Sequence, residues 1–503
     1  MKKVLFIKNA LVLTATALIL RLAGIIFKVW LAGEIGSEGI GLYQLIISLY
    51  VLVSTFATSG ISTAVTRLVT DELSVGSGKG AVRILKKGIV LSLIIAAITL
   101  SFTFFGSDFL AKRLIGDMRA APAIKILGLS LPFMGVSSCV RGYFIARRKT
   151  LSSSLSQILE QAARIIIVLS LAAGFSSKGL SYACAAVLFG DTAAEGLSCL
   201  FLCASYLIDR EKIKNVGGKA LPHGLKKIIH IALPITSGRY LNSGLRTAEN
   251  LIVPRALALF GGAAGGLSLF GMIKGMALPL LFFPSSFLNA VSTLLIPEMS
   301  EAVSKGQKYK IKYVAEKIMT LTAVSGFLLA SLFFSLSTPL SRLVYKNDDV
   351  AFLLRTLAPI VPLMYIDSVS DGILKGLDQQ SFCFRVSVFD SALRIVLIIL
   401  IVPKSGMNGF LFIMILSNLL TAFLRVYKML KLSEVRFITS KWLFLPLFCA
   451  AVSSLPVILI FRYLPFSLLI NTVLSVGAET ALYIVLSFIT RTVSTDDVRD
   501  LVK

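Results

Sequence analysis

Five basic residues stand inside stretches that are otherwise apolar, and two pairs of them share one spacing. Arg21 and Lys28 are seven residues apart, Arg239 and Arg246 are also seven apart, and Lys274 follows in the next apolar stretch. Seven residues are close to two turns of an α-helix, so the members of each pair project from one face of their helix. Arginine binds phosphate and pyrophosphate well because its guanidinium group donates two parallel hydrogen bonds. The spacing therefore predicts a cationic, water-filled cavity that holds an anionic group.

The same charges also have an explanation that needs no ligand. A charge inside a bilayer costs about 2.5–3.5 kcal/mol on insertion scales unless it faces water, a partner or a ligand. Lys28 and Arg246 could extend to the outer interface while Arg21 and Arg239 pair with carboxylates. We favour the cavity because the spacing is duplicated. Glu249, three residues after Arg246, is then either the partner of this arginine or a carboxylate that couples to a cation.

Two further pairs of opposite charge are four residues apart. They are Glu160 with Arg164 and Asp390 with Arg394. Residues at this spacing are neighbours on the surface of a helix, where opposite charges neutralise each other. We predict that both are structural ion pairs.

No catalytic or metal-binding constellation is visible in the sequence. It has no HExxH motif, no phosphate-binding loop and no GxGxxG motif, and its two histidines, His223 and His230, adjoin a basic loop. The six cysteines lie almost entirely in apolar stretches without CxxC spacing, which fits small core residues. We predict no catalytic residue, no cofactor and no metal site. A membrane enzyme acting on lipid carriers would need acids or a histidine on extended loops, and these loops are short.

The composition indicates that the chain folds in a lipid bilayer. Of its 503 residues, 56% are hydrophobic and only 15% are charged, and the mean hydropathy is +0.85. Soluble domains have about 25% charged residues. Apolar runs of about 20 residues can cross a bilayer as helices, so we predict an all-α polytopic membrane protein with about fourteen transmembrane helices. The predicted spans are 9–31, 41–66, 88–106, 124–146, 152–174, 179–207, 228–254, 267–296, 318–338, 352–375, 383–403, 408–427, 442–463 and 467–490.

The distribution of basic residues predicts that both termini are cytoplasmic. The net charge is +25, and basic clusters at Arg147–Lys149, Arg210–Lys227 and Lys305–Lys312 fall on one side of the predicted membrane. Cytoplasmic loops carry such an excess of Lys and Arg. The charge is thus a topology signal and requires no nucleic acid as a partner. We expect the first span to be retained and not removed as a signal peptide, because it is long and contains charge.

An internal repeat appears when the chain is shifted by 230 residues against itself. Copies that contain six helices have the same orientation, and two parallel lobes with the substrate site between them are a known plan of transporters. We predict an N-terminal lobe at 1–208, a basic cytoplasmic linker at 209–227, a C-terminal lobe at 228–432 and two additional helices at 440–490. The matched pairs include Gly41 and Gly271, Gln44 and Lys274, Pro132 and Pro362, Met134 and Met364, Gly142 and Gly372, Glu160 and Asp390, and Arg164 and Arg394.

Three stretches carry a resemblance to a known family. They are Gly33–Glu72, the segment LPITSGRYLNSGLRTAENLIVPRAL around Arg239, and Gly275–Ala302. Together they resemble the stage V sporulation protein B family of polysaccharide biosynthesis membrane proteins, within the superfamily of multidrug, oligosaccharidyl-lipid and polysaccharide exporters. The resemblance extends over essentially the whole chain. It implies a fourteen-helix flippase of the bacterial cytoplasmic membrane for undecaprenyl-pyrophosphate-linked saccharides, with the peptidoglycan precursor lipid II as the leading candidate.

The resemblance also implies roles for individual residues. In the related lipid II flippases, basic residues of the first and eighth helices line the central cavity. Arg21, followed three positions later by Gly24, matches the first-helix pattern, and Lys28 matches a later basic position. Lys274 falls near the eighth-helix arginine. Val29 stands where those flippases have an acidic residue, so no role that requires this carboxylate is carried over.

These observations predict a transporter that works by alternating access without making or breaking a covalent bond. The basic residues would hold the pyrophosphate and sugar of the substrate while the polyprenyl tail stays among the membrane lipids. The alternatives are a cation-coupled multidrug exporter, a flippase for another polysaccharide repeat unit, and a scaffold that recruits wall-synthesis enzymes. The basic cavity disfavours cationic drugs, and a scaffold has no need of buried charges. The coupling ion stays open.

Overall fold

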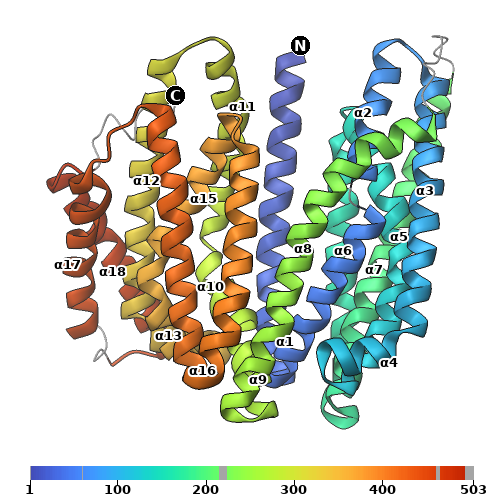
Figure 1. Cartoon of the computed structure of the whole chain (residues 1–503). Helices are drawn as coiled ribbons and strands as arrows, with labels where there is room; N and C mark the ends of the chain where they lie inside the picture. Colours follow the sequence, from blue (N-terminus) through green and yellow to red (C-terminus); the bar gives the residue numbers. More distant parts are fainter. Residues whose placement is uncertain (1, 59, 215–223, 460–464, 493–503) are drawn as a thin grey trace. The chain divides into compact units, whose positions relative to one another are not determined.

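The chain is built from helices and divides into two compact units. The structure is a computed structural model that describes residues 2–58, 60–214, 224–459 and 465–492 (Figure 1). The first unit comprises residues 1–252 and the second comprises residues 253–503. Eleven described helices are long and apolar enough to cross a membrane. The prediction of an all-helical polytopic membrane protein is confirmed.

Two of these eleven segments are long enough to hold more than one crossing each. Ala15–Ser74 has 60 residues and Gln380–Ser433 has 54, whereas one crossing needs about 20 residues. The helix that carries Arg239 and Arg246 is not among the eleven. The number fourteen therefore remains a prediction.

The first unit contains eight α-helices among its described residues. They are α1 (Lys2–Thr58), α2 (Ile61–Ser74), α3 (Gly78–Phe105), α4 (Ser107–Phe109), α5 (Ala121–Ala146), α6 (Thr150–Leu171), α7 (Phe175–Lys214) and α8 (Leu225–Gly261), of which α8 continues into the second unit. Three short segments are not α-helical: the π-helix η1 (Leu110–Ile115) and the 3₁₀-helices η2 (Met118–Ala120) and η3 (Ala172–Gly174).

Glycines at positive φ bend the longest helices where the sequence predicts separate spans. The φ angles are 68° at Gly36 within α1, 78° at Gly179 within α7 and 55° at Gly406 within α16 (Gln380–Ser433). A residue with a Cβ atom pays a steric cost in this region, and glycine does not. Each bend therefore redirects a helix at a single residue without a loop. The part of α1 before Gly36 and the part after it can face different neighbours.

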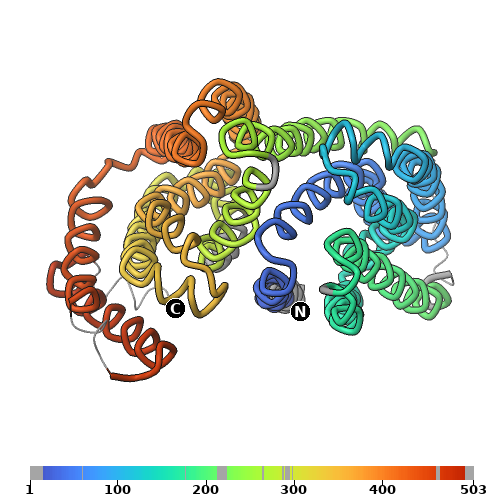
Figure 2. Tube along the Cα trace, turned by 90° about the horizontal axis from the view of Figure 1, so that it is seen from below, coloured from blue at the N-terminus to red at the C-terminus, as the bar shows by residue number. Residues whose placement is uncertain are grey.

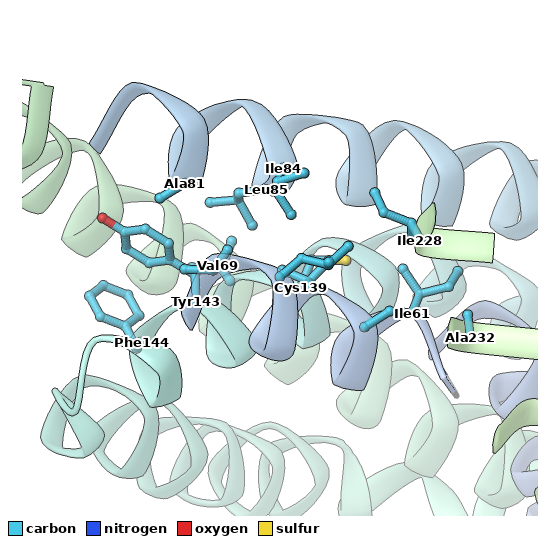
Figure 3. Packing of buried hydrophobic residues seen from close by; sticks show 14 of the residues in the cluster. Ile61, Val69, Ala81, Ile84, Leu85, Cys139, Tyr143, Phe144, Ile228 and Ala232 are labelled. Atoms are coloured by element: carbon cyan, nitrogen blue, oxygen red, sulfur yellow. The ribbon is translucent and has the colours of Figure 1, made fainter. Parts of the chain in front are cut away.

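A buried core fixes α8 against α2 in the first unit. Figure 3 shows Ile61 and Val69 of α2, Ile84 of α3, Tyr143 of α5 and Ala232 of α8 packed together. Each of these side chains is at most 6% exposed. Burial of such apolar area contributes about 25 cal/mol per Å². The core therefore holds the start of α8 in place, and the residues that follow along α8 are positioned by it.

Gly60 permits the close approach of α2 to α8. It has a φ of 73°, and a Cβ atom at this position would lie 2.1 Å from Thr236 Oγ1 and 2.5 Å from the carbonyl oxygen of Ala232. These distances are far below van der Waals contact, so any larger residue would push the helices apart. The glycine thus serves both the backbone conformation and the packing.

The second unit contains the remaining helices, and α17 and α18 lie at its margin in both views (Figures 1 and 2). They pack on each other and against α12. The elements are α9 (Ala263–Phe270), η4 (Gly271–Ala277), α10 (Leu278–Phe282), α11 (Ser285–Ser304), α12 (Lys308–Ser335), α13 (Ser337–Tyr345), α14 (Asp349–Leu357), η5 (Ala358–Ile360), α15 (Val361–Gly376), α16, η6 (Ser440–Phe444), α17 (Leu445–Leu459) and α18 (Leu468–Ile489). The division of the chain at 209–227 and 440 remains a prediction.

Candidate functional site

A polar cavity of about 490 Å³ lies between α1 and α8 in the first unit. On each helix the lining residues recur every three or four positions, so each helix presents one face to the cavity. Polar side chains dominate both faces. The lining residues are Gln44, Ile47, Ser48, Val51, Thr55 and Thr58 of α1, and Arg239, Asn242, Ser243, Arg246, Thr247 and Asn250 of α8.

Hydrogen bonds centred on Ser48 join the two helices at one end of the cavity. The Oγ1 of Thr247 donates to the carbonyl oxygen of Ser48 at 3.0 Å, and Nδ2 of Asn250 donates to Ser48 Oγ at 2.9 Å. At the other end, the rings of Phe56 and Tyr240 have centroids 3.8 Å apart. Different interactions thus join the two helices at these two places, and of the lining arginines Arg246 lies between them along α8.

Arg239 and Arg246 both line the cavity and are exposed. They are two helical turns apart, which corresponds to a rise of about 10 Å along α8. Asn242 lies between them on the same face. Guanidinium groups can donate paired hydrogen bonds to phosphate oxygens, and amide and hydroxyl groups can both donate and accept. The cavity is therefore suited to a ligand that combines an anion with many hydroxyl groups.

The other predicted basic residues lie elsewhere. Arg21 and Lys28 precede the bend at Gly36 on α1 and are not among the residues that line the cavity. Arg21 is exposed, whereas Lys28 is partly buried and within electrostatic range of Arg164 and Arg21. The structure thus brings Arg239 and Arg246 to one cavity and does not bring the first pair there. A substrate-binding role for Arg21 and Lys28 remains a prediction.

Lys274 lies in the second unit. It belongs to the π-helical segment η4 and is partly buried. Its equivalent at the 230-residue register is Gln44, which lines the cavity of the first unit. The repeat therefore links Lys274 to a cavity position by sequence, and its predicted contact with substrate is untested.

Glu249 is buried on α8, with only 3% of its surface exposed. It does not line the cavity, although its neighbour Asn250 and the preceding Thr247 do. Its side chain therefore points to another face of α8. Both predicted roles, partner of Arg246 and coupling carboxylate, stay open.

The predicted ion pair on α6 is part of a larger network in the first unit. Arg164 Nη2 lies 3.4 Å from Glu160 Oε1, and Arg164 Nε lies 2.6 Å from Asp191 on α7. From α5, Arg141 Nη2 lies 2.6 Å from Glu160 Oε2 and donates to Ser198 Oγ at 2.9 Å. The network therefore joins α5, α6 and α7.

A second network joins α15 to α16 in the second unit. Arg394 Nη2 lies 3.1 Å from Asp390 Oδ2, which is the predicted pair. Arg425 Nη1 lies 2.5 Å from Asp367 Oδ2, and Arg425 Nε lies 3.5 Å from Asp371 Oδ1. The whole Arg425 residue is 8% exposed. It is a buried cation between two carboxylates.

Sequence reasoning missed several of these residues. Arg425 is the single charged residue of the predicted span 408–427, and Arg141 shares the span 124–146 only with Lys125. A cation without an acid in its own span does not reveal its partner. The repeat carried a signal, since the 230-residue shift places Arg141 opposite Asp371. The amides Asn242 and Asn250 of the cavity also went unnoticed, although they lie on the helical face of Arg239 and Arg246.

Comparison with known proteins agrees with the fold. A family model described as polysaccharide biosynthesis protein matches residues 6–303. Over 511 aligned residues, the chain is 24% identical to stage V sporulation protein B of Bacillus subtilis (strain 168), which covers 99% of this chain and 98% of that protein. More than half of the chain thus matches the family model, and the relative matches along its whole length.

Two solved structures show the same architecture. The lipid II flippase MurJ in an inward closed conformation has a TM-score of 0.71 at 15% identity and covers 98% of this chain and 100% of that chain. An inward-facing multidrug resistance MATE family transporter of the MOP superfamily has a TM-score of 0.67 at 15% identity and covers 84% of this chain and 99% of that chain. Neither is an enzyme, which agrees with the expectation from sequence. The chain belongs to the polysaccharide biosynthesis protein family, and it is a multi-pass membrane protein with the fold of the MOP superfamily.

Proposed function

We propose that the chain is a flippase that moves an undecaprenyl-pyrophosphate-linked saccharide from the inner to the outer leaflet of a bacterial cytoplasmic membrane, with lipid II as the leading candidate. The observation that carries this proposal is the cavity in which Arg239 and Arg246 lie beside amide and hydroxyl groups. Pyrophosphate and sugar are the two chemical groups that this lining fits. The family and the flippase fold support the same substrate class.

The cavity residues bind and orient the substrate, and no covalent bond changes. Arg239 and Arg246 hold the pyrophosphate oxygens, while Gln44, Asn242 and Asn250 exchange hydrogen bonds with sugar hydroxyls in place of water. The polyprenyl tail stays in lipid, since hydrocarbon gains nothing from a polar cavity. The proposal also includes the predicted architecture: two six-helix lobes, two additional helices, and both termini on the cytoplasmic side. Alternating access then exposes the cavity to one side of the membrane and later to the other.

The basic lining also distinguishes this proposal from drug export. A MATE transporter shares the fold, but a cationic drug would meet Arg239 and Arg246 as like charges, which costs free energy. A flippase for a different saccharide repeat unit would use the same pyrophosphate contacts. The saccharide is therefore a question for direct measurement, whereas the anionic linkage follows from the cavity.

The test is reconstitution in liposomes with a fluorescent, pyrophosphate-linked polyprenyl disaccharide and a membrane-impermeant quencher. The wild-type chain should make inner-leaflet substrate accessible to the quencher. Hydrogen bonds to charged groups contribute about 1.5–3 kcal/mol, so Arg239→Ala and Arg246→Ala should each slow flipping roughly 10- to 100-fold. The double variant should insert into the membrane normally and transport at background rate.

Arg255→Ala is the matched control. Arg255 is an exposed arginine on the same helix that does not line the cavity, so its loss should leave the rate unchanged. Normal flipping by the double variant Arg239→Ala, Arg246→Ala would reject the cavity as the substrate site. Efflux of a cationic dye without lipid flipping would instead favour the drug exporter.

A further inference from the structure

Glu479 is a buried carboxyl group in surroundings that contain almost no charge. It lies on α18 of the second unit and is 0% exposed. It is the single charged residue of α18, α17 has none, and α12 has none from Ile318 to Ser335. These are the helices that pack around it (Figure 1). A carboxylate buried in this way pays a large desolvation cost unless a cation or a proton neutralises it.

The contacts of Glu479 include no cation among the described residues. The Oγ of Ser335 on α12 donates to Glu479 Oε2 at 2.7 Å. The other oxygen, Oε1, is buried and has no hydrogen-bond partner in the described part of the chain. Ser331, one turn earlier on α12, is a second hydroxyl close to the carboxyl, but its Oγ donates to the carbonyl oxygen of Leu328 at 2.8 Å. Hydroxyl groups alone do not offset the desolvation of a full negative charge. The free oxygen is the place where a proton would sit.

Titratable and charged groups on the helices packed against α18 have other partners. On α13, which also packs against α18, Arg342 Nε lies 2.6 Å from Asp348 Oδ1. The Tyr483 hydroxyl donates to the carbonyl oxygen of Val324 at 2.8 Å, and the Cys449 sulfur lies 3.7 Å from Thr490 Oγ1. None of them is directed at the Glu479 carboxyl.

A second cavity, lined in part by hydroxyl groups, includes the residue that donates a hydrogen bond to Glu479. Its volume is about 290 Å³, and Ser335, which donates to Glu479, is one of its lining residues. Thr472 and Ser475, two turns and one turn before Glu479 on α18, line it as well. Hydroxyls both donate and accept, so they can pass a proton.

The same cavity disfavours a metal cation. Arg342 and Arg355 line it, and the guanidinium of Arg355 lies 4.9 Å from the ring centroid of Phe334. Arg342 is paired with Asp348, so Arg355 is the positive charge of the lining that repels Na⁺ or K⁺. A proton can be relayed through hydroxyls and water without carrying a hydrated ion past this charge.

We propose that Glu479 binds a proton in the folded protein, and that loss of this proton through the hydroxyl-lined cavity loosens α18 from α12. The neutral carboxyl suits its apolar surroundings. The carboxylate still accepts the hydrogen bond of Ser335, but it is otherwise desolvated and gains by moving toward water. In a transporter without a nucleotide-binding motif such a site would let a proton gradient act on the helices, a link that rests on the proposed function.

Infrared difference spectroscopy on the purified full-length chain tests the protonation directly. The spectrum of wild type minus Glu479→Gln at neutral pH should contain the carbonyl stretch of a protonated carboxyl, which is well separated from carboxylate bands. Raising the pH should replace it by carboxylate bands. Ser335→Ala removes the donor to the charged form, so its carboxyl band should persist to higher pH. Carboxylate bands alone at neutral pH, whether or not they respond to Na⁺, would overturn the proposal.

Hydrogen exchange tests the effect on packing. After correction for the intrinsic pH dependence of exchange, the amides of α18 should exchange at least several-fold faster at alkaline than at neutral pH in the wild type. Glu479→Gln cannot ionise, so its α18 should show no such change. Glu298, an exposed acid on α11, provides the control variant Glu298→Gln, which should behave like the wild type. Equal pH responses of wild type and Glu479→Gln would refute the loosening.

These measurements do not depend on flipping. If the chain does not flip lipid but shows the carboxyl band and the pH-dependent exchange, the proton site stands and the proposed function falls. If it flips lipid and Glu479 is ionised at neutral pH, the reverse holds.

Discussion

The two units carry opposite charges at corresponding positions of the repeat. A shift of 230 residues places Arg141 on Asp371 and Glu195 on Arg425. In the first unit, Arg141 on α5 lies 2.6 Å from Glu160. In the second unit the cation, Arg425, is on α16, and the position that corresponds to Arg141 holds Asp371 of α15. The fold thus requires charges that compensate each other at these helix contacts, and it does not require a particular helix to carry the positive one.

The exchange of charges changes which group of each network is shared between two partners. In the first unit one carboxylate, Glu160, is shared by two arginines, Arg141 at 2.6 Å and Arg164 at 3.4 Å. Loss of one arginine leaves the carboxylate with the other. The first network therefore has a reserve partner for its shared charge.

In the second network one cation is shared by two carboxylates, the reverse of the first network. One arginine, Arg425, lies 2.5 Å from Asp367 and 3.5 Å from Asp371. Asp371 also pairs with Lys375, one turn later on α15. Asp367 has no second cation among the ion pairs of the described residues. Loss of Arg425 therefore leaves two neighbouring carboxylates, one of them without a counter-charge.

The largest expected effect is that of Arg425→Ala. Removing one partner of a buried ion pair costs about 3–5 kcal/mol because the remaining charge stays desolvated. Thermal and denaturant unfolding of the purified chain in detergent should show a loss of this size. Ser387→Ala is the control, since Ser387 Oγ accepts from Arg425 Nη2 at 2.9 Å and its removal should cost only about 1 kcal/mol. Similar losses for both variants would mean that charge pairing does not hold α15 to α16.

A smaller effect is expected from Arg141→Ala. Glu160 keeps Arg164, so the cost should be about 1–3 kcal/mol, the range for one lost buried hydrogen-bonding partner. The same unfolding experiments measure it. The double variant Arg141→Ala, Arg164→Ala should cost more than the two single variants together, because only then does Glu160 lose both cations. A loss for Arg141→Ala as large as that for Arg425→Ala would contradict the reserve-partner explanation.

The helical architecture could be predicted from the sequence because bilayer thickness sets the length of apolar segments. The conformation of the connections between the helices was harder to predict. The sequence predicts separate spans at 9–31 and 41–66, and non-helical backbone at Gly36 does divide α1 into two helices between them, but they meet at this residue without the polar loop that the sequence suggests. A short polar stretch has the same composition whether it forms a loop or a bent helix. Only the backbone conformation of one glycine separates the two cases.

The candidate site could be predicted in part. Helical periodicity placed Arg239 and Arg246 on one face of α8, and both line the cavity. Periodicity does not say which surface the face meets. The opposite wall is formed by residues from Gln44 to Thr58 and not by Arg21 and Lys28, because tertiary packing decides which segment of α1 lies beside α8.

The most selective test of the comparison is to give the second unit the residues of the first. Asp371→Arg alone places a second cation beside Arg425, and Arg425→Glu alone places a third acid beside Asp367 and Asp371. Both single variants should be destabilised. The triple variant Asp367→Ser, Asp371→Arg, Arg425→Glu reproduces the residue types at the equivalent positions of the first unit. Coupling between contacting residues is about 0.5–3 kcal/mol. The loss in free energy of unfolding of the triple variant should therefore be smaller, by about that amount, than the summed losses of the three single variants.

The outcome separates two explanations of the exchanged signs. If compensation between neighbours is sufficient, the triple variant regains stability, since Arg at 371 can reach Asp390 as Arg141 reaches Glu160 in the first unit. If the second unit needs its cation on α16 for another reason, such as the hydrogen bond to Ser387, the triple variant stays as unstable as Arg425→Glu alone. Flipping measured on the same three variants then shows whether the sign pattern serves stability only, because a triple variant that is stable but inactive would give the exchange a role in transport.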